Sequence, residues 1–383
     1  MRIAMISGSY PGMDCGVGDY TRNLASAIRA RGREIAVLTR RDPRILTGDG
    51  LPVLGVAAQW GPLGLVTLLS RLRSFGPDVV HLQYGTIAYD EKASICLLPV
   101  ACRTALPRAR MVTTVHTPKG PYWFPKAGSW RDRLFGLLVG GSDAVITTTN
   151  GQAGQIARLV GSDKPVDVVP VGPGILPGRR DVTRRSTFRR KIGVGPHDMM
   201  FVTFGVIHPD HDYRSLLEGF RSACGGRDDA KLFLVGGGGR GAGTITRDWV
   251  ARQLREMGLE RIVHLTGYLR EEVAREYLTA ADAAIQVYGG GVSDARSSFA
   301  TVTAFGLPVI TTTGPDQPDT VRAGANALLV PPGDPAAMAA AIAALAGSIC
   351  LRAALRKGTA DLRARYSWDS VAESTERVYR GGA

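Results

Sequence analysis

Short runs rich in β-branched residues alternate with amphipathic stretches along most of the chain. The first half contains, in this order, RIAMISG, GDYTRNLASAIRARG, REIAVLTR, LVTLLSRLRSFG and DVVHLQY. Strands that alternate with helices form parallel sheets with helices on both faces. The pattern therefore predicts an α/β protein with doubly wound sheets.

The alternation is interrupted once, by a stretch rich in Gly, Pro and Arg from Gly172 to about Pro196. A second strand–helix series begins at MMFVTFGVI, directly after that stretch. A chain of 383 residues is also too long for one ordinary hydrophobic core. We predict two doubly wound domains, residues 1–178 and 196–366, facing a cleft at their strand carboxyl ends.

The bulk composition is that of a folded protein, with 44% hydrophobic and 21% charged residues. The apolar start MRIAMISGSY is short and is followed by Gly, Pro and Asp, so it predicts neither a signal peptide nor a membrane span, and we expect a cytoplasmic protein. Five cysteines without C-x-x-C spacing argue against a disulfide framework and against zinc.

Basic residues outnumber acidic ones by 47 to 34, and many lie in RRDVTRRSTFRRK, residues 179–191. Such a run is usually a solvated face or a linker. An anionic membrane surface, contacted peripherally, and an acidic ligand remain alternatives. Nucleic acid is disfavoured as a partner, because no recognised nucleic-acid motif accompanies the charge.

Two features at strand ends of the first half are typical of a binding site. The loop PGMDCGVGDYTRN opens the first helix, and Gly16 and Gly18 would let backbone amides approach a bound group closely. His116 lies at the end of the strand in MVTTVHTPKG, where it would reach the cleft. The loop lacks the third glycine and the ribose acid of a dinucleotide site, so a tight turn remains the alternative.

The second half contains a loop that is polar and leads into a helix. In GVSDARSSFATVTAFGLPVITTT, residues 291–313, Arg296, Ser297 and Ser298 lie beside a helix N-terminus, which favours an anion such as a diphosphate. The glycine run LVGGGGRGAG, with Gly237 and Arg240, fits either a flexible turn or a phosphate or ribose contact.

The loop GVIHPDHDYRS superficially suggests metal ligands, because it carries two histidines and two acids. No other residues complete a ligand set at suitable spacing, so we predict no metal site.

Taken together and in this order, these segments resemble the retaining nucleotide-sugar glycosyltransferases of family four, which have two Rossmann-like domains, the GT-B fold. The markers include CGVGDYTRNLASAIRARGREIAVLT, DVVHLQY, VTTVHTPKG, LTGYL and TAFGLPVITTTGPDQPDTV. The resemblance implies that the last helix, residues 367–383, crosses back to the N-terminal domain. The N-terminal domain would then take the acceptor, and residues 196–366 would bind the nucleotide sugar.

The resemblance also assigns roles to individual residues. His116 and Asp294 would be catalytic, and His116 would touch the transferred sugar. The donor diphosphate and sugar would contact Gly16, Gly18, Arg296, Ser297 and Ser298. The nucleotide would contact Gly205, Gly237, Arg240, Gly267, Tyr268, Leu269 and Thr301. The acceptor would contact Asp19, Tyr20 and Tyr84.

The chain departs from the family pattern at four positions. Ser293 and Thr301 replace two glutamates, and Val206 and His211 replace the Arg and Lys that usually hold the phosphates. A diphosphate leaving group needs its negative charge stabilised, so Arg296 and the serines beside it are the nearest substitutes.

The expected function is transfer of a sugar from a nucleoside diphosphate to an acceptor small molecule, lipid or glycan, with retention and without a metal or other cofactor. High Arg, Ala and Gly content favours a bacterium, in glycan or secondary-metabolite biosynthesis. The alternative is a catalytically altered nucleotide-sugar-binding protein of the same fold.

Overall fold

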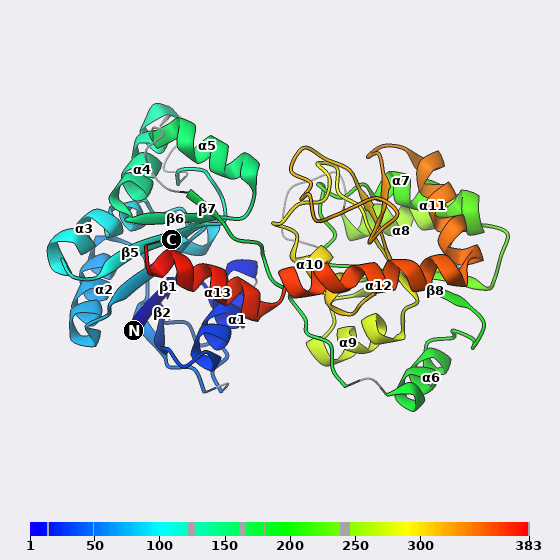
Figure 1. The fold of residues 1–383 in the computed structure, drawn as a ribbon, viewed down its shortest axis with the longest axis horizontal. Coiled ribbons are helices and arrows are strands. Elements are labelled where there is room, and N and C mark those ends of the chain that lie inside the picture. Colours follow the sequence, from blue (N-terminus) through cyan, green and yellow to red (C-terminus); the bar gives the residue numbers. More distant parts are fainter. Residues whose placement is uncertain are drawn as a thin grey trace. The chain divides into compact units, whose positions relative to one another are not determined.

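The computed structural model describes residues 1–13, 15–48, 50–121, 128–160, 166–179, 181–237 and 246–381. The chain divides into two compact units, which are shown in Figure 1. The first unit comprises Met1–Val171 and Trp368–Ala383, and the second comprises Gly172–Ser367. Both units are Rossmann-like α/β domains.

The first unit is built on a parallel sheet, in which seven strands are described in the order β3-β2-β1-β4-β5-β6-β7. The strands are β1 (Arg2–Ser7), β2 (Glu34–Arg40), β3 (Val53–Ala57), β4 (Val79–Tyr84), β5 (Arg110–Val115), β6 (Ala144–Thr147) and β7 (Val166–Val168). The helices are α1 (Gly16–Ala30), α2 (Pro62–Phe75), α3 (Leu98–Ala105), α4 (Gly128–Gly141), α5 (Asn150–Val160) and α13 (Trp368–Tyr379), with short 3-10 turns η1 (Thr86–Tyr89) and η2 (Ala93–Leu97).

Alternate residues of β1 pack on opposite faces of this sheet, as strand geometry requires. Ile3 and Met5 lie in a core with side chains of α1 and α13, whereas Ala4 and Ile6 lie in a core with side chains of α2, α3 and α4. Helices thus cover both faces, and the predicted doubly wound arrangement is confirmed.

The last helix, α13, packs on the first unit, as the family resemblance implied (Figure 1). The ring of Trp368 lies edge-on to Tyr20 of α1, with centroids 5.4 Å apart. The buried carboxylate of Glu376 accepts a hydrogen bond from Arg33 at 2.9 Å and lies 3.0 Å from a guanidinium nitrogen of Arg380. Both apolar and ionic contacts therefore hold this helix in place.

Replacing Glu376 with glutamine is expected to make the first unit less stable at neutral pH, by about 2 kcal/mol. Burial alone would raise the pKa of Glu376, but the hydrogen bond from Arg33 and the charges of Arg33, Arg31 and Arg380 lower it below its usual 4.5. A carboxylate with a lowered pKa stabilises the folded state above its unfolded pKa, and this stabilisation is lost as the pH falls through the folded pKa.

Thermal unfolding of the wild type and of Glu376→Gln, measured from neutral pH downward, tests this expectation. The difference in midpoint should shrink once the pH falls below 4.5, the ordinary pKa of glutamate. A difference that stays constant well below that pH would show that the charge of Glu376 contributes nothing.

The second unit is also built on a parallel sheet, in which six strands are described in the order β10-β9-β8-β11-β12-β13. The strands are β8 (Met199–Phe204), β9 (Ala230–Val235), β10 (Val263–Gly267), β11 (Ala283–Gln286), β12 (Val309–Thr312) and β13 (Leu328–Val330). The helices are α6 (Val182–Lys191), α7 (Tyr213–Cys224), α8 (Arg247–Met257), α9 (Glu271–Ala280), α10 (Ser297–Ala304), α11 (Pro335–Gly347) and α12 (Ile349–Arg365).

The core of this unit again has two layers, one on each face of the sheet. Phe201 packs with side chains of α7, α8 and α11, and Met200 packs with side chains of α9, α10 and α12. No single helix among the described residues is long and apolar enough to cross a membrane.

Most of the described residues in the basic run 179–191 are exposed, as predicted for a solvated face, but the run forms a helix and is not a linker. Residues 182–191 form α6, whose first turn is capped by Asp181 accepting from the Arg184 amide at 3.0 Å. Phe188 is buried against Tyr277, and the buried guanidinium of Arg189 donates to Asp282 at 3.0 Å. The run therefore belongs to the second unit. That unit begins at Gly172, whereas the predicted first domain ended at residue 178 and the predicted second domain began at residue 196.

Candidate active site

In the second unit, the loops after β8 and β11 meet at the start of α10. Gly205, directly after β8, has φ +128°, and a Cβ added there would lie 3.3 Å from the Cβ of Ser298. A side chain at position 205 would therefore strain the backbone and crowd the start of α10. This close approach brings the predicted nucleotide residue Gly205 beside the predicted diphosphate residue Ser298.

Arg296 immediately precedes α10 and lies where an anion could be held. Its guanidinium carbon is 4.5 Å from the centroid of the Tyr288 ring, and one nitrogen is 2.5 Å from a carboxylate oxygen of Asp210. The Tyr288 hydroxyl is 2.7 Å from that of Ser298, and the Ser297 hydroxyl donates to the Gly172 carbonyl at 3.2 Å. The cation is thus oriented beside a helix N-terminus, which itself favours negative charge.

His211, which replaces a family lysine, lies in the same cluster. Its ring centroid is 5.3 Å from that of Tyr288 and 6.4 Å from that of His208. Burial lowers the pKa of His211 to about 4, and the positive charge of Arg296 acts in the same direction against the opposing charge of Asp210. Its Nδ1 atom is buried and has no hydrogen-bond partner among the described residues. The lowered pKa favours a neutral His211 at neutral pH, so Arg296 is the charged group of this cluster that could face an anion.

Within the part of the chain that the structure describes, no group of three or more His, Cys, Asp or Glu side chains could hold a metal ion. His208, His211 and Asp210 instead make the ring and charge contacts given above, and Asp212 caps α7 by accepting from the Ser215 amide at 3.2 Å.

The structure corrects the catalytic prediction for Asp294. Its carboxylate forms an ion pair with Arg365 and accepts a hydrogen bond from the Tyr366 hydroxyl at 2.8 Å. The side chain is only 9% exposed. A carboxylate bound in this way joins the start of α10 to the end of α12, so Asp294 is a structural residue.

Thr301 is likewise not available to a nucleotide. Its hydroxyl donates to the Ser297 carbonyl at 2.7 Å and accepts from the Gly174 amide at 2.9 Å, and the residue is fully buried. Ser293, at the other glutamate position, is 7% exposed, and its carbonyl accepts from the Arg296 amide at 3.1 Å. Thr301 thus supports the polypeptide around Arg296 through its side chain, whereas the bond at Ser293 is made by the backbone.

The residues predicted to receive the base lie at the carboxyl ends of β9 and β10. Tyr268 is 87% exposed, and a Cβ added to Gly237 would lie 3.2 Å from its Cβ, so these two residues are adjacent. Gly267 has φ +72°, which favours glycine, and Leu269 packs partly buried against the core. Arg240 lies outside the described residues.

In the first unit, His116 lies directly after β5, as predicted. Its Nε2 atom is 2.9 Å from the side-chain oxygen of Gln83, and its ring lies edge-on to Tyr20 with centroids 4.8 Å apart. Burial lowers the pKa of His116 to about 4, so the imidazole is neutral at neutral pH. The sequence pattern located His116 but did not indicate Gln83, a polar residue inside a buried strand.

The predicted glycines at the start of α1 differ in their surroundings. A Cβ added to Gly18 would lie 2.8 Å from the Cα of Tyr10, so only glycine fits there, whereas Gly16 is exposed with no atom within 4 Å of an added Cβ. The backbone at Gly16 is therefore accessible to a ligand.

Two of the three predicted acceptor residues are buried. Tyr84 is 0% exposed and its hydroxyl donates to the Lys119 carbonyl at 2.9 Å, which corrects its assignment to the acceptor. Tyr20 is 4% exposed, lies between His116 and Trp368, and supports these rings instead of contacting an acceptor through its hydroxyl. Asp19 is exposed, as an acceptor contact requires.

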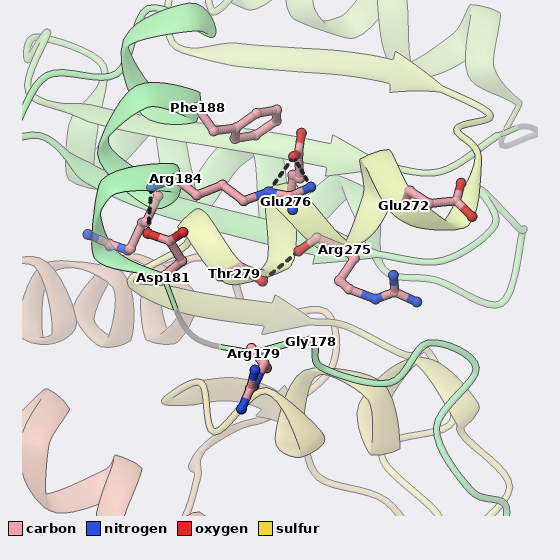
Figure 2. Close-up of a pocket in the computed structure, with 10 residues that line it drawn as sticks. Gly178, Arg179, Asp181, Arg184, Phe188, Glu272, Arg275, Glu276 and Thr279 are labelled. Carbon is pink, nitrogen blue, oxygen red and sulfur yellow. Dashed lines mark hydrogen bonds and ion pairs between the residues drawn. The ribbon is translucent and has the colours of Figure 1, made fainter.

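A cavity of about 400 Å³ lies elsewhere in the second unit, between α6 and α9 (Figure 2). Arg184 points toward Glu276 across it, with an ion pair at 2.6 Å, and Arg275 pairs with Glu271 at 2.5 Å. None of its lining residues is a predicted site residue. Its basic side chains are largely matched by acidic ones, and it adds nothing to the donor site.

Two family models match the chain. The glycosyl transferase 4-like domain matches residues 15–172, and the glycosyl transferases group 1 domain matches residues 199–348. Each match covers the greater part of one unit. The chain belongs to the glycosyltransferases with two Rossmann-like domains, the GT-B fold, and the resemblance to family four is confirmed.

Curated relatives extend over nearly the whole chain. It is 27% identical over 418 residues to a D-inositol 3-phosphate glycosyltransferase of Kineococcus radiotolerans, covering 99% of this chain and 95% of the relative. It is 24% identical over 427 residues to a glycogen synthase of Mycobacterium tuberculosis, covering 99% and 94%.

Solved structures show the same fold. HepE of Anabaena, in complex with UDP and glucose, aligns with a TM-score of 0.75 at 16% identity over 99% of both chains. Sucrose-phosphate synthase of Thermosynechococcus elongatus aligns with a TM-score of 0.73 at 21% identity, covering 99% of this chain and 98% of that one.

Proposed function

We propose that this glycosyltransferase transfers a sugar from a nucleoside diphosphate to an acceptor with retention of anomeric configuration, in bacterial glycan or secondary-metabolite biosynthesis. The observation that carries the proposal is Arg296, held over Tyr288 beside the N-terminus of α10. A guanidinium at a helix N-terminus suits a diphosphate, both when the donor binds and when the diphosphate departs.

The chemistry follows from the charges that develop. The bond between the anomeric carbon and the diphosphate oxygen breaks, the acceptor oxygen bonds to the same face of that carbon, and the acceptor proton passes to the departing phosphate. Arg296 and the helix N-terminus stabilise the charge on the leaving group. The ion pair of Asp294 with Arg365 supports a direct transfer through an oxocarbenium-like state over a covalent intermediate on this carboxylate.

The names of the relatives do not identify the acceptor of this chain. One relative is named for inositol phosphate and another for glycogen, so the names support sugar transfer in general. The proposal therefore extends to a small molecule, a lipid or a glycan as acceptor. Metal independence is part of the proposal, on the strength of the resemblance to family four.

A second candidate function is binding of a nucleotide sugar without its consumption. The observation that favours it is the loss of four polar or charged family residues, at the positions of Val206, His211, Ser293 and Thr301. The Thr301 hydroxyl is instead bound to the Gly174 amide and the Ser297 carbonyl.

Thermal unfolding with UDP, GDP, ADP and TDP sugars, followed by assay of released nucleoside diphosphate with and without EDTA, separates the two candidates. Binding raises the unfolding midpoint by mass action in both cases. The transferase releases nucleoside diphosphate in either buffer, and the binding protein releases none. Absence of binding to the whole panel would contradict both.

Replacing Asp210 with asparagine is expected to tighten nucleoside diphosphate binding by about tenfold. The carboxylate of Asp210 occupies Arg296 at 2.5 Å and would repel a phosphate brought to the same guanidinium. Isothermal titration of the wild type, Asp210→Asn and the exposed control Asp228→Asn measures the effect. Unchanged binding by Asp210→Asn would show that the phosphates do not approach Arg296, and weaker binding would show that Asp210 orients the guanidinium without competing with them.

A further inference from the structure

Polar side chains buried in the sheet of the first unit form a connected row that ends at His116. The Tyr379 hydroxyl of α13 lies 2.6 Å from Nδ1 of His81, and Nε2 of His81 lies 2.7 Å from the Thr114 hydroxyl. The side-chain nitrogen of Gln83 is 3.1 Å from Nε2 of His81, and its oxygen is 2.9 Å from Nε2 of His116. The row thus joins the last helix to His116 through His81 and Gln83 of β4, and Thr114 of β5 is a further contact of His81.

Every member of this row beneath His116 is buried. His81, Gln83 and Thr114 are 0% exposed, and Tyr379 is 4% exposed. Buried polar groups destabilise a fold unless they are paired, and apolar residues could fill the same volume without that requirement. Such a row in a central strand is therefore typical of a positioning role.

The hydrogen bond that His116 donates to Gln83 distinguishes the two nitrogens of His116. A carbonyl oxygen only accepts, so the Nε2 atom of His116 donates to it and carries the proton. The opposite tautomer would direct the Nε2 lone pair at the Gln83 oxygen, which is repulsive. In a neutral imidazole, Nδ1 is then an acceptor, and it has no hydrogen-bond partner among the described residues.

We propose that Gln83 is a positioning residue that fixes His116 as the Nε2–H tautomer, so that Nδ1 accepts a hydrogen bond from a hydroxyl of the bound sugar. The part that concerns the sugar rests on the proposed function. Tyr379 holds His81, and His81 in turn limits where the Gln83 amide can lie. The last helix is thereby part of the support of the reacting centre.

The His116 ring is also linked to the last helix through the ring of Tyr20 in α1. Tyr20 lies edge-on to His116 at 4.8 Å, and Trp368 of α13 lies edge-on to Tyr20 at 5.4 Å. Two residues of α13, one near each end of the helix, thus reach His116 through one intermediate ring or through the polar row.

Nitrogen-15 NMR of the full chain labelled at histidine tests the proposal without any donor. Imidazole nitrogen shifts distinguish a protonated from an unprotonated ring nitrogen, and the chain has six histidines, so the spectrum is small. The resonances of His116 are assigned by their absence in His116→Asn. In the wild type, Nε2 should be protonated and Nδ1 unprotonated at neutral pH.

Three variants then test the row. Gln83→Met removes the acceptor at similar length and should convert His116 to a mixture of tautomers, whereas Gln83→Glu retains an acceptor oxygen and should retain the proton on Nε2. Tyr379→Phe should move the His81 resonances. Tyr89→Phe is the matched control, because the buried Tyr89 hydroxyl donates to the Ile6 carbonyl at 3.4 Å, outside the row.

Each outcome is decisive. A wild-type His116 protonated on Nδ1, or a mixture in the wild type, overturns the proposal. So does a tautomer that is unchanged in folded Gln83→Met. Unchanged His81 and His116 resonances in Tyr379→Phe remove the last helix from the proposal. Failure to bind any nucleotide sugar would count against the proposed function and would leave these NMR results unaffected.

Once a donor is identified, activity supplies a second readout. Gln83→Met is expected to lower kcat by about tenfold with a smaller change in donor KM, because the sugar would be held less well oriented in the transition state. Gln83→Glu should recover part of the loss. An equal loss in both variants would indicate packing damage in place of lost positioning.

Discussion

Replacing Arg296 with alanine is expected to weaken nucleoside diphosphate binding by about 2 kcal/mol, or roughly 30-fold in dissociation constant. The guanidinium is the cation nearest the N-terminus of α10, where it lies over Tyr288. Its loss removes a charge-assisted contact and also leaves the carboxylate of Asp210 without its 2.5 Å partner, so that it repels the phosphates. Isothermal titration with nucleoside diphosphates measures the change.

The matched control is Arg261→Ala, in the same unit. Arg261 pairs with Asp228, and both side chains are about three-quarters exposed, at 76% and 75%. An exposed pair contributes little, so this variant should bind nucleotide like the wild type. Equal affinity of Arg296→Ala and the wild type would remove Arg296 from the donor site.

Replacing Asp294 with alanine is expected to destabilise the second unit by about 3 kcal/mol, as breaking a buried ion pair does. The change leaves Arg365 without its carboxylate and the Tyr366 hydroxyl without its acceptor, at a position where the aspartate side chain is only 9% exposed. Scanning calorimetry should show a lower unfolding midpoint for this unit.

Asp228→Ala, which breaks the exposed pair with Arg261, is the control and should shift the midpoint by little. If Asp294→Ala unfolded like the wild type while its turnover collapsed, the structural role assigned to Asp294 would be wrong and the original catalytic prediction would stand.

The fold was predictable because its strands are buried runs at regular intervals. Strands such as β1 and β8 are nearly continuous apolar segments, and each is followed by an amphipathic helix. The helix α6 was missed because seven basic residues in residues 179–191 conceal its apolar contacts. Phe188 packs against Tyr277 in the core, as an apolar residue of an amphipathic helix does. The other buried residue, Arg189, is paired with Asp282, which lies 93 positions away in the sequence.

The candidate site was predictable only where local sequence determines it. Arg296 and Ser298 follow from a polar loop before a helix, and His116 follows from its place after a strand. The roles of Asp294 and Thr301 depend on partners far along the chain, since Asp294 binds Arg365 71 positions later and Thr301 binds Gly174 127 positions earlier. The local sequence does not reveal such distant pairings. Gln83 was not predicted either, because its partner His116 lies 33 positions later in the chain.

Proton NMR of the anomeric centre during turnover of an α-linked nucleoside diphosphate sugar tests whether the chain transfers the sugar with retention. We expect the donor signal to be replaced by that of an α-linked product as nucleoside diphosphate is released, and His116→Ala to slow this conversion greatly. A β-linked product, or a donor that stays intact while it is bound, would contradict the proposed retaining transfer.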